Sequence, residues 1–284
     1  MEENEAMLSN YEFNLSDFAL FLSVMKNPRA YRNVLSIFLE EPDIELTEVK
    51  VEQVVLNKSG KRAIRLDAWA KSTDDRRFNM EMQNDTSKDD VRKRSRYYQG
   101  LLDSPILKSG KETRYKYLPS TVIIFITQDD IFGMDRAQYT FSEQCEEIAG
   151  LKLDDGTKKI FFNLTSKNGS QELISLLQYM KRTDIQNPDI TVKDERILEL
   201  DDIVQEVKAS EEWEAVKMSI LEIGIEKGTE IGIQRGLQQG LQQKLREQVE
   251  KKLKKGLSVA EIADMLEEEE SVIVQIVEII NNNK

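Results

Sequence analysis

Hydrophobic and polar residues alternate along two short stretches of the chain, at residues 65–70 and 76–83. In the first stretch one side consists of Leu66, Ala68 and Ala70, and the other of Arg65, Asp67 and Trp69. In the second, Phe78, Met80 and Met82 share one side, and Asn79, Glu81 and Gln83 share the other. A turn at residues 71–75 separates the stretches. This alternation predicts a β-hairpin with one buried face.

The polar face of this hairpin carries the candidate chemistry. If the turn is centred near Asp74, the numbers of paired residues add up to about 148, which places Asp67 opposite Glu81. Two carboxylates directly across a sheet repel each other, and a divalent cation between them removes that cost. Hard carboxylate oxygens suit Mg²⁺ or Mn²⁺. We therefore expect a metal site at Asp67 and Glu81, with Gln83 beside Glu81 on the same face.

The patterns on either side of the hairpin predict the remaining elements of a core. Apolar residues at helical spacing predict helices at residues 16–25, 28–41 and 85–103. Residues 48–56 are a further expected strand, followed by a turn at residues 57–60. Residues 120–127 are nearly all apolar, as in a strand buried on both faces. A last short strand is expected at residues 158–164 and a helix at residues 170–182.

Beyond a predicted boundary at residues 188–194 the chain is almost wholly helical in pattern. Glycine recurs there at every fourth position: Gly224, Gly228, Gly232, Gly236 and Gly240. Each glycine inside a helix costs about 1 kcal/mol relative to alanine. Either close helix–helix contact compensates for this cost, or the segment is a bendable linker, or it is a low-complexity repeat without a specific role.

The last part of the chain resembles a helix-turn-helix. Ser258 and Glu261 have the spacing of a capping box at the start of a helix, and apolar residues line this helix and the next. The four glutamates at residues 267–270 make the unit a poor reader of DNA, so we expect oligomerisation or partner binding here. The expected domains are therefore residues 1–190, with the hairpin, and residues 191–284, a helical oligomerisation tail.

Composition narrows the chemistry. The sequence contains no histidine, which removes Ser-His triads, histidine general acid/base catalysis and His-ligated zinc. The net charge is −12, but residues 1–183 carry 27 Lys and Arg against 29 Asp and Glu, so the acidity belongs to the tail. A single cysteine, an acidic N-terminus and the lack of an apolar run of about 18 residues favour a cytoplasmic protein without a membrane span.

Asp67 followed by Glu81-Met82-Gln83 on the next strand resembles the PD-(D/E)XK nuclease signature, with Gln in place of Lys. Together with Asp17-Phe18 and Arg96-Tyr97-Tyr98, the set resembles the recombination-promoting nuclease and transposase family, over residues 14–182 and again in the glycine-repeat tail. The predicted order α-β-β-β-α-β is that of a restriction-endonuclease-like α/β core with a mixed sheet. The motif's Pro is replaced by Leu66.

The resemblance implies a Mg²⁺- or Mn²⁺-dependent DNA endonuclease, a hydrolase of phosphodiester bonds, with Asp67, Glu81 and Gln83 as catalytic residues. The alternative is a catalytically weak or inactive oligomeric protein of the same fold that binds DNA or a partner. Transposition is a third option, because it needs strand transfer as well as cleavage. The partners expected are DNA and further copies of the chain through its tail.

Two features remain open between a structural and a functional role. Asp17 is either a helix cap or, as the resemblance implies, a residue near the metal. The basic side chains of the helix at residues 85–103 either form a solvated face or contact DNA phosphates. The candidate phosphate contacts are Lys88, Arg92, Arg96 and Tyr97. Trp69 shares the face of Asp67, and we expect it to pack under the first helix rather than to contact DNA.

Overall fold

The computed structural model describes residues 11–55, 64–87, 89–106 and 114–282. By its contacts the chain divides after Val216, within a long helix, into two compact units. Because the two units are not placed relative to one another, each is described by itself. None of the helices in the described ranges is both long and apolar enough to cross a membrane.

The first unit is built on a mixed sheet of six strands with the order β1-β2-β3-β4-β6-β5. The strands are β1 (Leu46–Val55), β2 (Ile64–Ser72), β3 (Arg77–Gln83), β4 (Thr121–Thr127), β5 (Gln138–Phe141) and β6 (Thr157–Asn163). β1, β2 and β3 form an antiparallel meander, β3, β4 and β6 run parallel, and β5 pairs antiparallel with β6 at the edge. The apolar run predicted as a strand buried on both faces is β4, in which every residue is buried.

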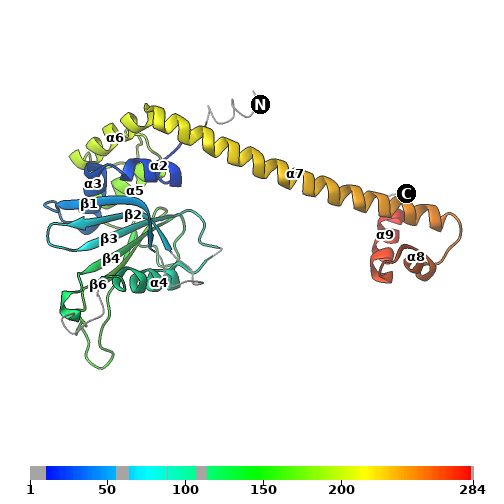
Figure 1. The fold of residues 1–284 in the computed structure, drawn as a ribbon, viewed down its shortest axis with the longest axis horizontal. Coiled ribbons are helices and arrows are strands. Elements are labelled where there is room, and N and C mark those ends of the chain that lie inside the picture. The colour runs from blue at the N-terminus through cyan, green and yellow to red at the C-terminus, as the bar shows by residue number, and fades with distance from the viewer. Residues whose placement is uncertain (1–10, 56–63, 88, 107–113, 283–284) are drawn as a thin grey trace. The chain divides into compact units, whose positions relative to one another are not determined.

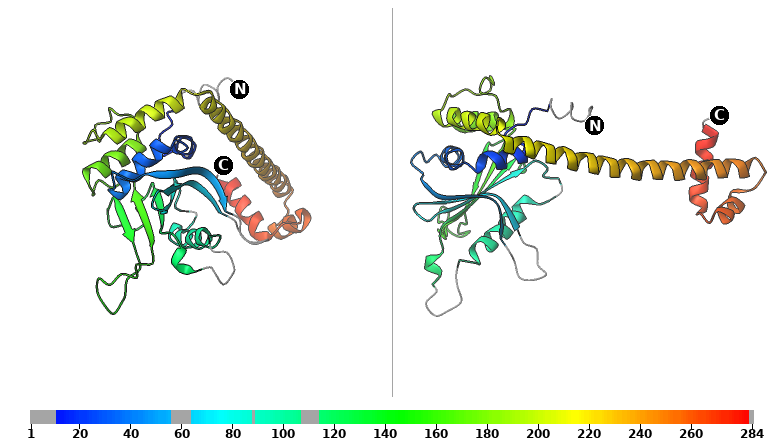
Figure 2. Two further views of the ribbon diagram at one scale, coloured as in Figure 1. Left: turned by 60° about the vertical axis from the view of Figure 1, so that its left-hand side comes forward. Right: turned by 45° about the horizontal axis from the view of Figure 1, so that its top comes forward.

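Helices cover both faces of this sheet. They are α2 (Phe18–Met25), α3 (Pro28–Leu39), α4 (Val91–Asp103), α5 (Gln171–Lys181) and α6 (Glu195–Lys208), with a 3₁₀ turn, η1, at Tyr115–Tyr117. Figures 1 and 2 show α3 and α5 on one face, with α6 beyond them, and α4 alone on the opposite face. The mixed sheet with flanking helices confirms the predicted restriction-endonuclease-like α/β fold.

Three predictions about elements were wrong in detail. The helix expected from residue 85 begins only at Val91, because the Asp90 side chain accepts hydrogen bonds from the backbone N–H groups of Arg92 and Lys93 and so caps it. No strand was expected at β5, a four-residue edge strand. Trp69 is buried, but in a cluster that contains Tyr98 and Leu102 of α4, so it does not pack under the first helix. The turn expected at residues 57–60 lies outside the described residues.

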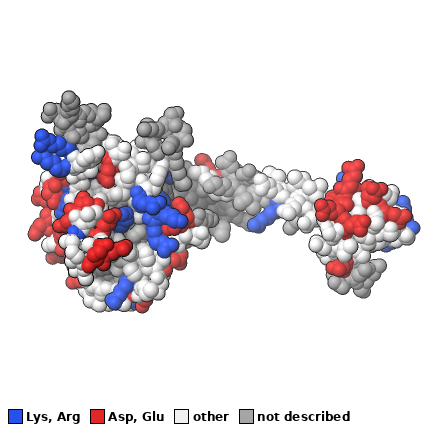
Figure 3. Space-filling model, turned by 90° about the horizontal axis from the view of Figure 1, so that it is seen from below, with Lys and Arg blue, Asp and Glu red and all other residues white. Residues whose placement is uncertain are grey.

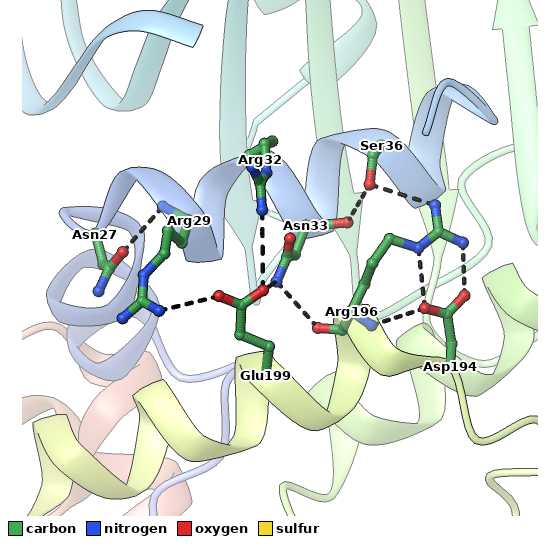
Figure 4. Close-up of polar contacts among 8 residues, drawn as sticks. All are labelled: Asn27, Arg29, Arg32, Asn33, Ser36, Asp194, Arg196 and Glu199. Atoms are coloured by element: carbon green, nitrogen blue, oxygen red, sulfur yellow. Dashed lines mark hydrogen bonds and ion pairs between the residues drawn. The ribbon is translucent and has the colours of Figure 1, made fainter. Parts of the chain in front are cut away.

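Hydrogen bonds and ion pairs connect helix α6 to α3, and we call this set of contacts the polar seam (Figure 4). The buried amide of Asn33 donates to Glu199 Oε2 at 2.8 Å and to the Arg196 carbonyl at 3.3 Å. Arg29 adds an ion pair to Glu199 at 3.1 Å, and Arg196 donates to the Ser36 hydroxyl at 3.3 Å. By these contacts α6 lies within the first unit. The division into domains at residues 190 and 191 remains a prediction about which segments fold independently.

The second unit contains most of α7 (Glu211–Leu253), α8 (Val259–Leu266) and α9 (Glu270–Asn282). All five glycines of the repeat lie inside α7, a continuous helix of 43 residues. The end of α7 forms a small core with the two short helices: Val249, Ile262, Ala263, Ile273 and Ile280. The capping box predicted at Ser258 and Glu261 is present at the start of α8.

The seam predicts that α6 contributes to the stability of the sheet-containing unit. Leu200, which is 0 % exposed, and Leu198, which is 40 % exposed, lie on the same helix. Leu200→Ala should lower the free energy of unfolding by about 2 to 4 kcal/mol, because it leaves a cavity in a packed interior. Leu198→Ala should change it by less than about 0.5 kcal/mol. Equal effects of the two variants in urea denaturation would contradict this assignment of α6.

Candidate active site

Asp67 and Glu81 meet across the β2–β3 hairpin. Ala68 lies opposite Met80 and Trp69 opposite Asn79, which is the predicted register. The Asp67 backbone N–H donates to Glu81 Oε1 at 3.1 Å, and the Met82 backbone N–H donates to Asp67 Oδ2 at 3.1 Å. Each carboxylate is therefore tied to the backbone of the opposite strand. Asp67 is 6 % exposed and Glu81 is 0 % exposed.

The two buried acids have unusual protonation behaviour. Burial, together with the negative charge of Asp67, raises the pKa of Glu81 to about 8 against the opposing effect of Arg94. Burial also raises the pKa of Asp67 to about 6, against the hydrogen bond from Met82 and the charge of Arg94. Even with Arg94 beside them, and without a bound metal ion, both carboxyls therefore stay protonated to a higher pH than exposed acids do.

Arg94, on α4, was not identified from the sequence as a site residue. One of its terminal nitrogens donates to Glu81 Oε2 at 2.6 Å and the other to Gln83 Oε1 at 2.7 Å. Its Nε donates to the Tyr98 hydroxyl at 2.9 Å. The guanidinium also lies 4.9 Å from the centre of the Tyr98 ring and 5.5 Å from that of Phe125. A signal was present, because Arg94 is three and four positions from the buried residues Val91 and Tyr98 and so shares their helix face.

Gln83 and Asn79 are the other polar groups beside the acids. The Gln83 carbonyl oxygen accepts from Arg94, and its amide nitrogen donates to the Asp85 carbonyl at 2.5 Å, so both ends of the side chain are held. Asn79, which is fully buried, donates to Glu81 Oε1 at 2.9 Å. Asn79 was assigned to the polar face from the sequence but was given no role there.

An open pocket of about 750 Å³ lies in front of this cluster. Its lining combines site residues with basic and aromatic ones: Phe18, Ile64, Arg65, Asp67, Met82, Gln83, Asp89, Asp90, Lys93, Arg94, Tyr97 and Tyr98. Glu81 is absent from this lining and lies deeper, beneath Arg94, which bonds its Oε2 atom. The structure thus brings Asp67, Gln83 and Tyr97 to one pocket, with Glu81 behind it.

The remaining candidate residues lie at the margin. Arg92 and Arg96 are exposed on α4 and do not line the pocket. Lys88 lies outside the described residues. Asp17 occupies the N-cap position of α2 without a capping hydrogen bond, and its carboxylate accepts instead from the Asn14 backbone N–H at 2.7 Å. Its neighbour Phe18 lines the pocket, but Asp17 does not.

The side chains at this site offer the type of ligand atom, oxygen, that a small hard cation prefers. Asp67, Glu81 and Gln83 offer only oxygen donors, and Mg²⁺ is commonly held by one or two carboxylates with the remaining positions filled by water and phosphate oxygens. The set is sparse, since the described residues contain no group of three or more acidic or Cys side chains that could hold a metal ion. Glu81 Oε2 also accepts a hydrogen bond from the Arg94 guanidinium, whose positive charge opposes a cation at this oxygen.

Comparison with known proteins identifies a family. A family model described as PD-(D/E)XK nuclease family transposase matches residues 17–219, which is more than half of the chain. No curated protein and no solved structure gives a match. The matched range contains both carboxylates, Gln83 and Arg94, and ends close to the division at Val216.

Burial of the acids predicts a stability that depends on pH. Because the folded-state pKa of Asp67 is raised, its stabilising contribution is present at low pH and is lost as the pH rises through about 6. Asp67→Asn keeps an oxygen that can accept from Met82 and removes the charge. It should therefore raise the free energy of unfolding of the metal-free protein near pH 8 by on the order of 2 kcal/mol.

The gain should shrink as the pH falls towards about 4, where the wild-type carboxyl is protonated in the folded state. Chemical denaturation in the presence of a chelator, at several pH values, measures both effects. A variant that is less stable than wild type near pH 8 would show that the Asp67 charge is not a cost to the fold. The exposed Asp89→Asn, also at the pocket, is the matched control and should show little change.

Proposed function

The chain belongs to the PD-(D/E)XK nuclease family transposases, and on this basis we propose that it is a Mg²⁺- or Mn²⁺-dependent DNA endonuclease. One observation supports this most strongly: two buried carboxylates on adjacent strands, one of them lining an open pocket, face each other beside a basic helix. Family membership indicates a nuclease or transposase-associated role. We propose in addition the metal ion, the DNA substrate and the roles of the individual residues.

In this proposal Asp67 and Glu81 hold the metal. A bound divalent cation polarises the scissile phosphate and lowers the pKa of a water molecule that attacks it. Gln83 is neutral and has its carbonyl oxygen bonded to Arg94, so it orients a water molecule or the guanidinium rather than supplying a charge itself. Asn79 and the Asp67 backbone N–H hold Glu81 Oε1 in place.

The basic surface of α4 is proposed to hold the DNA backbone. Lys93 lines the pocket and its side chain is 77 % exposed, while Arg92 and Arg96 lie on the exposed side of the same helix. Figure 3 shows a cluster of basic side chains beside acidic ones on the face of the first unit seen there, and acidic side chains on the end of the tail. Lys88 and Tyr97 remain proposed phosphate contacts. Asp17 remains only a possible supporting residue, because it does not line the pocket.

A second candidate function rests on a specific observation. Glu81 is fully buried and bonded to Arg94, and glutamine replaces the usual lysine of the motif. Both features favour a weak or inactive nuclease that binds DNA or a partner. Transposition proper is a further possibility within the family and would require strand transfer in addition to cleavage. A cytoplasmic location remains a prediction from composition.

We also propose that the chain forms a homo-oligomer through its tail. Apart from each glycine's chain neighbours and the adjacent backbone of α7 itself, no atom of the described part of the chain lies within 4 Å of the Cβ positions that side chains at Gly224, Gly232, Gly236 or Gly240 would have. Three large apolar side chains in the same region are at least 61 % exposed: Ile233, Leu237 and Leu241. They recur every fourth residue, as do the glycines. Packing against a second copy would bury them and offset the cost of glycine in the helix.

The metal proposal predicts the behaviour of four variants in a plasmid-nicking assay with Mg²⁺ or Mn²⁺. Asp67→Asn and Glu81→Ala should each lower the cleavage rate by about 100-fold or more, because a metal ligand is lost. Gln83→Ala should lose much of the activity, and Gln83→Lys should keep part of it. Since Asp67→Asn is expected to be more stable than wild type, its inactivity could not be attributed to unfolding. Full activity in both Asp67→Asn and Glu81→Ala would refute the proposed site.

The oligomer proposal predicts that the full chain is at least a dimer in multi-angle light scattering. Leu237→Lys together with Leu241→Lys should shift it towards the monomer, because charges then replace the apolar stripe. The matched control is Gln238→Lys with Gln242→Lys, at exposed neighbouring positions of the same helix, which should leave the oligomer intact. A monomeric wild type, or equal dissociation of both double variants, would end the proposal.

A further inference from the structure

Every oxygen of Glu81 is already engaged. Oε1 accepts from the Asp67 backbone N–H and from the Asn79 side chain, and Oε2 accepts from Arg94 at 2.6 Å. The Arg94 ion pair is the shortest of these contacts, and its acidic partner is fully buried. A carboxylate has about four lone-pair sites, so one site remains on Oε2, but a cation bound there would lie against the positively charged guanidinium and be repelled by it.

Of the three donors, the guanidinium is the one that can leave. The Asp67 N–H belongs to the backbone of β2, and Asn79 is fully buried in β3. Arg94 is at the surface of the cluster, with its side chain 23 % exposed, and it lines the pocket. It also bridges Glu81 and Gln83, so its positive charge occupies the space in front of both residues.

We propose that Arg94 is an internal cation that occupies this place in the metal-free protein, and that a divalent metal binds Glu81 only by displacing it. The inference rests on the proposed nuclease function, and it means that Arg94 regulates metal binding at the same site. It also explains why glutamine, Gln83, stands where the family motif usually has lysine. A lysine in place of Gln83 would set a second cation against Arg94, whereas the glutamine carbonyl accepts a hydrogen bond from it at 2.7 Å.

The displaced guanidinium has a defined second role. Arg94 is anchored near Tyr98 and Phe125 by ring contacts, and it opens onto the same pocket as Lys93 and Tyr97. Rotation away from Glu81 therefore keeps the charge at the pocket, where it can bond a phosphate oxygen through two N–H groups. Arg94 would then supply the positive charge that Gln83 lacks, so it would oppose metal binding and assist cleavage.

Arg94→Met tests the first part, because it removes the charge and keeps an apolar stem over the rings. Mg²⁺ binding to the full chain is measured by isothermal titration calorimetry, and the unfolding temperature is measured with chelator and with saturating Mg²⁺. The variant should bind Mg²⁺ about tenfold more tightly than wild type, since no ion pair has to be broken. Its unfolding temperature should be lower than that of wild type in the presence of chelator. Saturating Mg²⁺ should raise this temperature by more than it does in wild type. Arg92→Met, on the exposed side of the same helix, should match wild type in both measurements.

The proposed role of Arg94 in cleavage is tested by measuring cleavage rates and by moving the positive charge from position 94 to position 83. Arg94→Met should nick plasmid DNA more slowly at saturating Mg²⁺ although it binds the metal more tightly, and Arg94→Lys should keep part of the activity. Arg94→Gln combined with Gln83→Lys places the cation on β3 and should cleave faster than Arg94→Gln alone.

The outcomes separate this inference from the proposed function. Tighter Mg²⁺ binding by Arg94→Met with no cleavage by any form would support Arg94 as the internal cation and refute the nuclease. Cleavage by wild type with equal or weaker Mg²⁺ binding by Arg94→Met would overturn the inference and leave the nuclease standing. If Mg²⁺ binds neither form, both proposals fail.

Discussion

The structure of the site depends on the burial of two carboxylates on facing strands. Each accepts a backbone N–H from the other strand, so the hairpin that forms the sheet also brings the two negative charges together. Water is largely excluded, and both pKa values are raised. Such an arrangement lowers stability unless positive charge is supplied. Arg94 supplies it in the present structure, and a divalent cation would supply it in the proposed enzyme.

This constraint explains why so much of the site could be predicted. Alternation of period two fixes which residues share a face, and a short turn fixes the register, so Asp67 and Glu81 were placed opposite each other from spacing alone. β4 was predicted because a strand buried on both faces needs a continuous apolar run. What local pattern could not supply was contact between distant segments. The helical spacing of Arg94 from Val91 and Tyr98 indicates which face of α4 it shares, but its contact with Glu81 depends on how that face packs against the sheet. β5 was missed because a four-residue edge strand has too short a pattern.

The stability of the helical tail depends on whether helix–helix packing offsets the cost of its glycines. Glycine inside a continuous helix lowers its stability. At Gly224, Gly232, Gly236 and Gly240 no other part of the described chain packs close enough to offset this cost. The small core around Val249 and Ile262 stabilises only the end of the helix. The exposed apolar side chains at Ile233, Leu237 and Leu241 therefore support the proposed association with another copy. Two nuclease sites in one assembly would also suit cleavage of two antiparallel strands.

The most direct test of the account is a crystal structure of the full chain grown with Mn²⁺, read through anomalous difference density. The expected result is a manganese peak within coordination distance of Asp67 and Glu81, with the Arg94 guanidinium moved away from Glu81 into the pocket. Saturating Mn²⁺ with no peak at these carboxylates, and with Arg94 still bonded to Glu81, would contradict it.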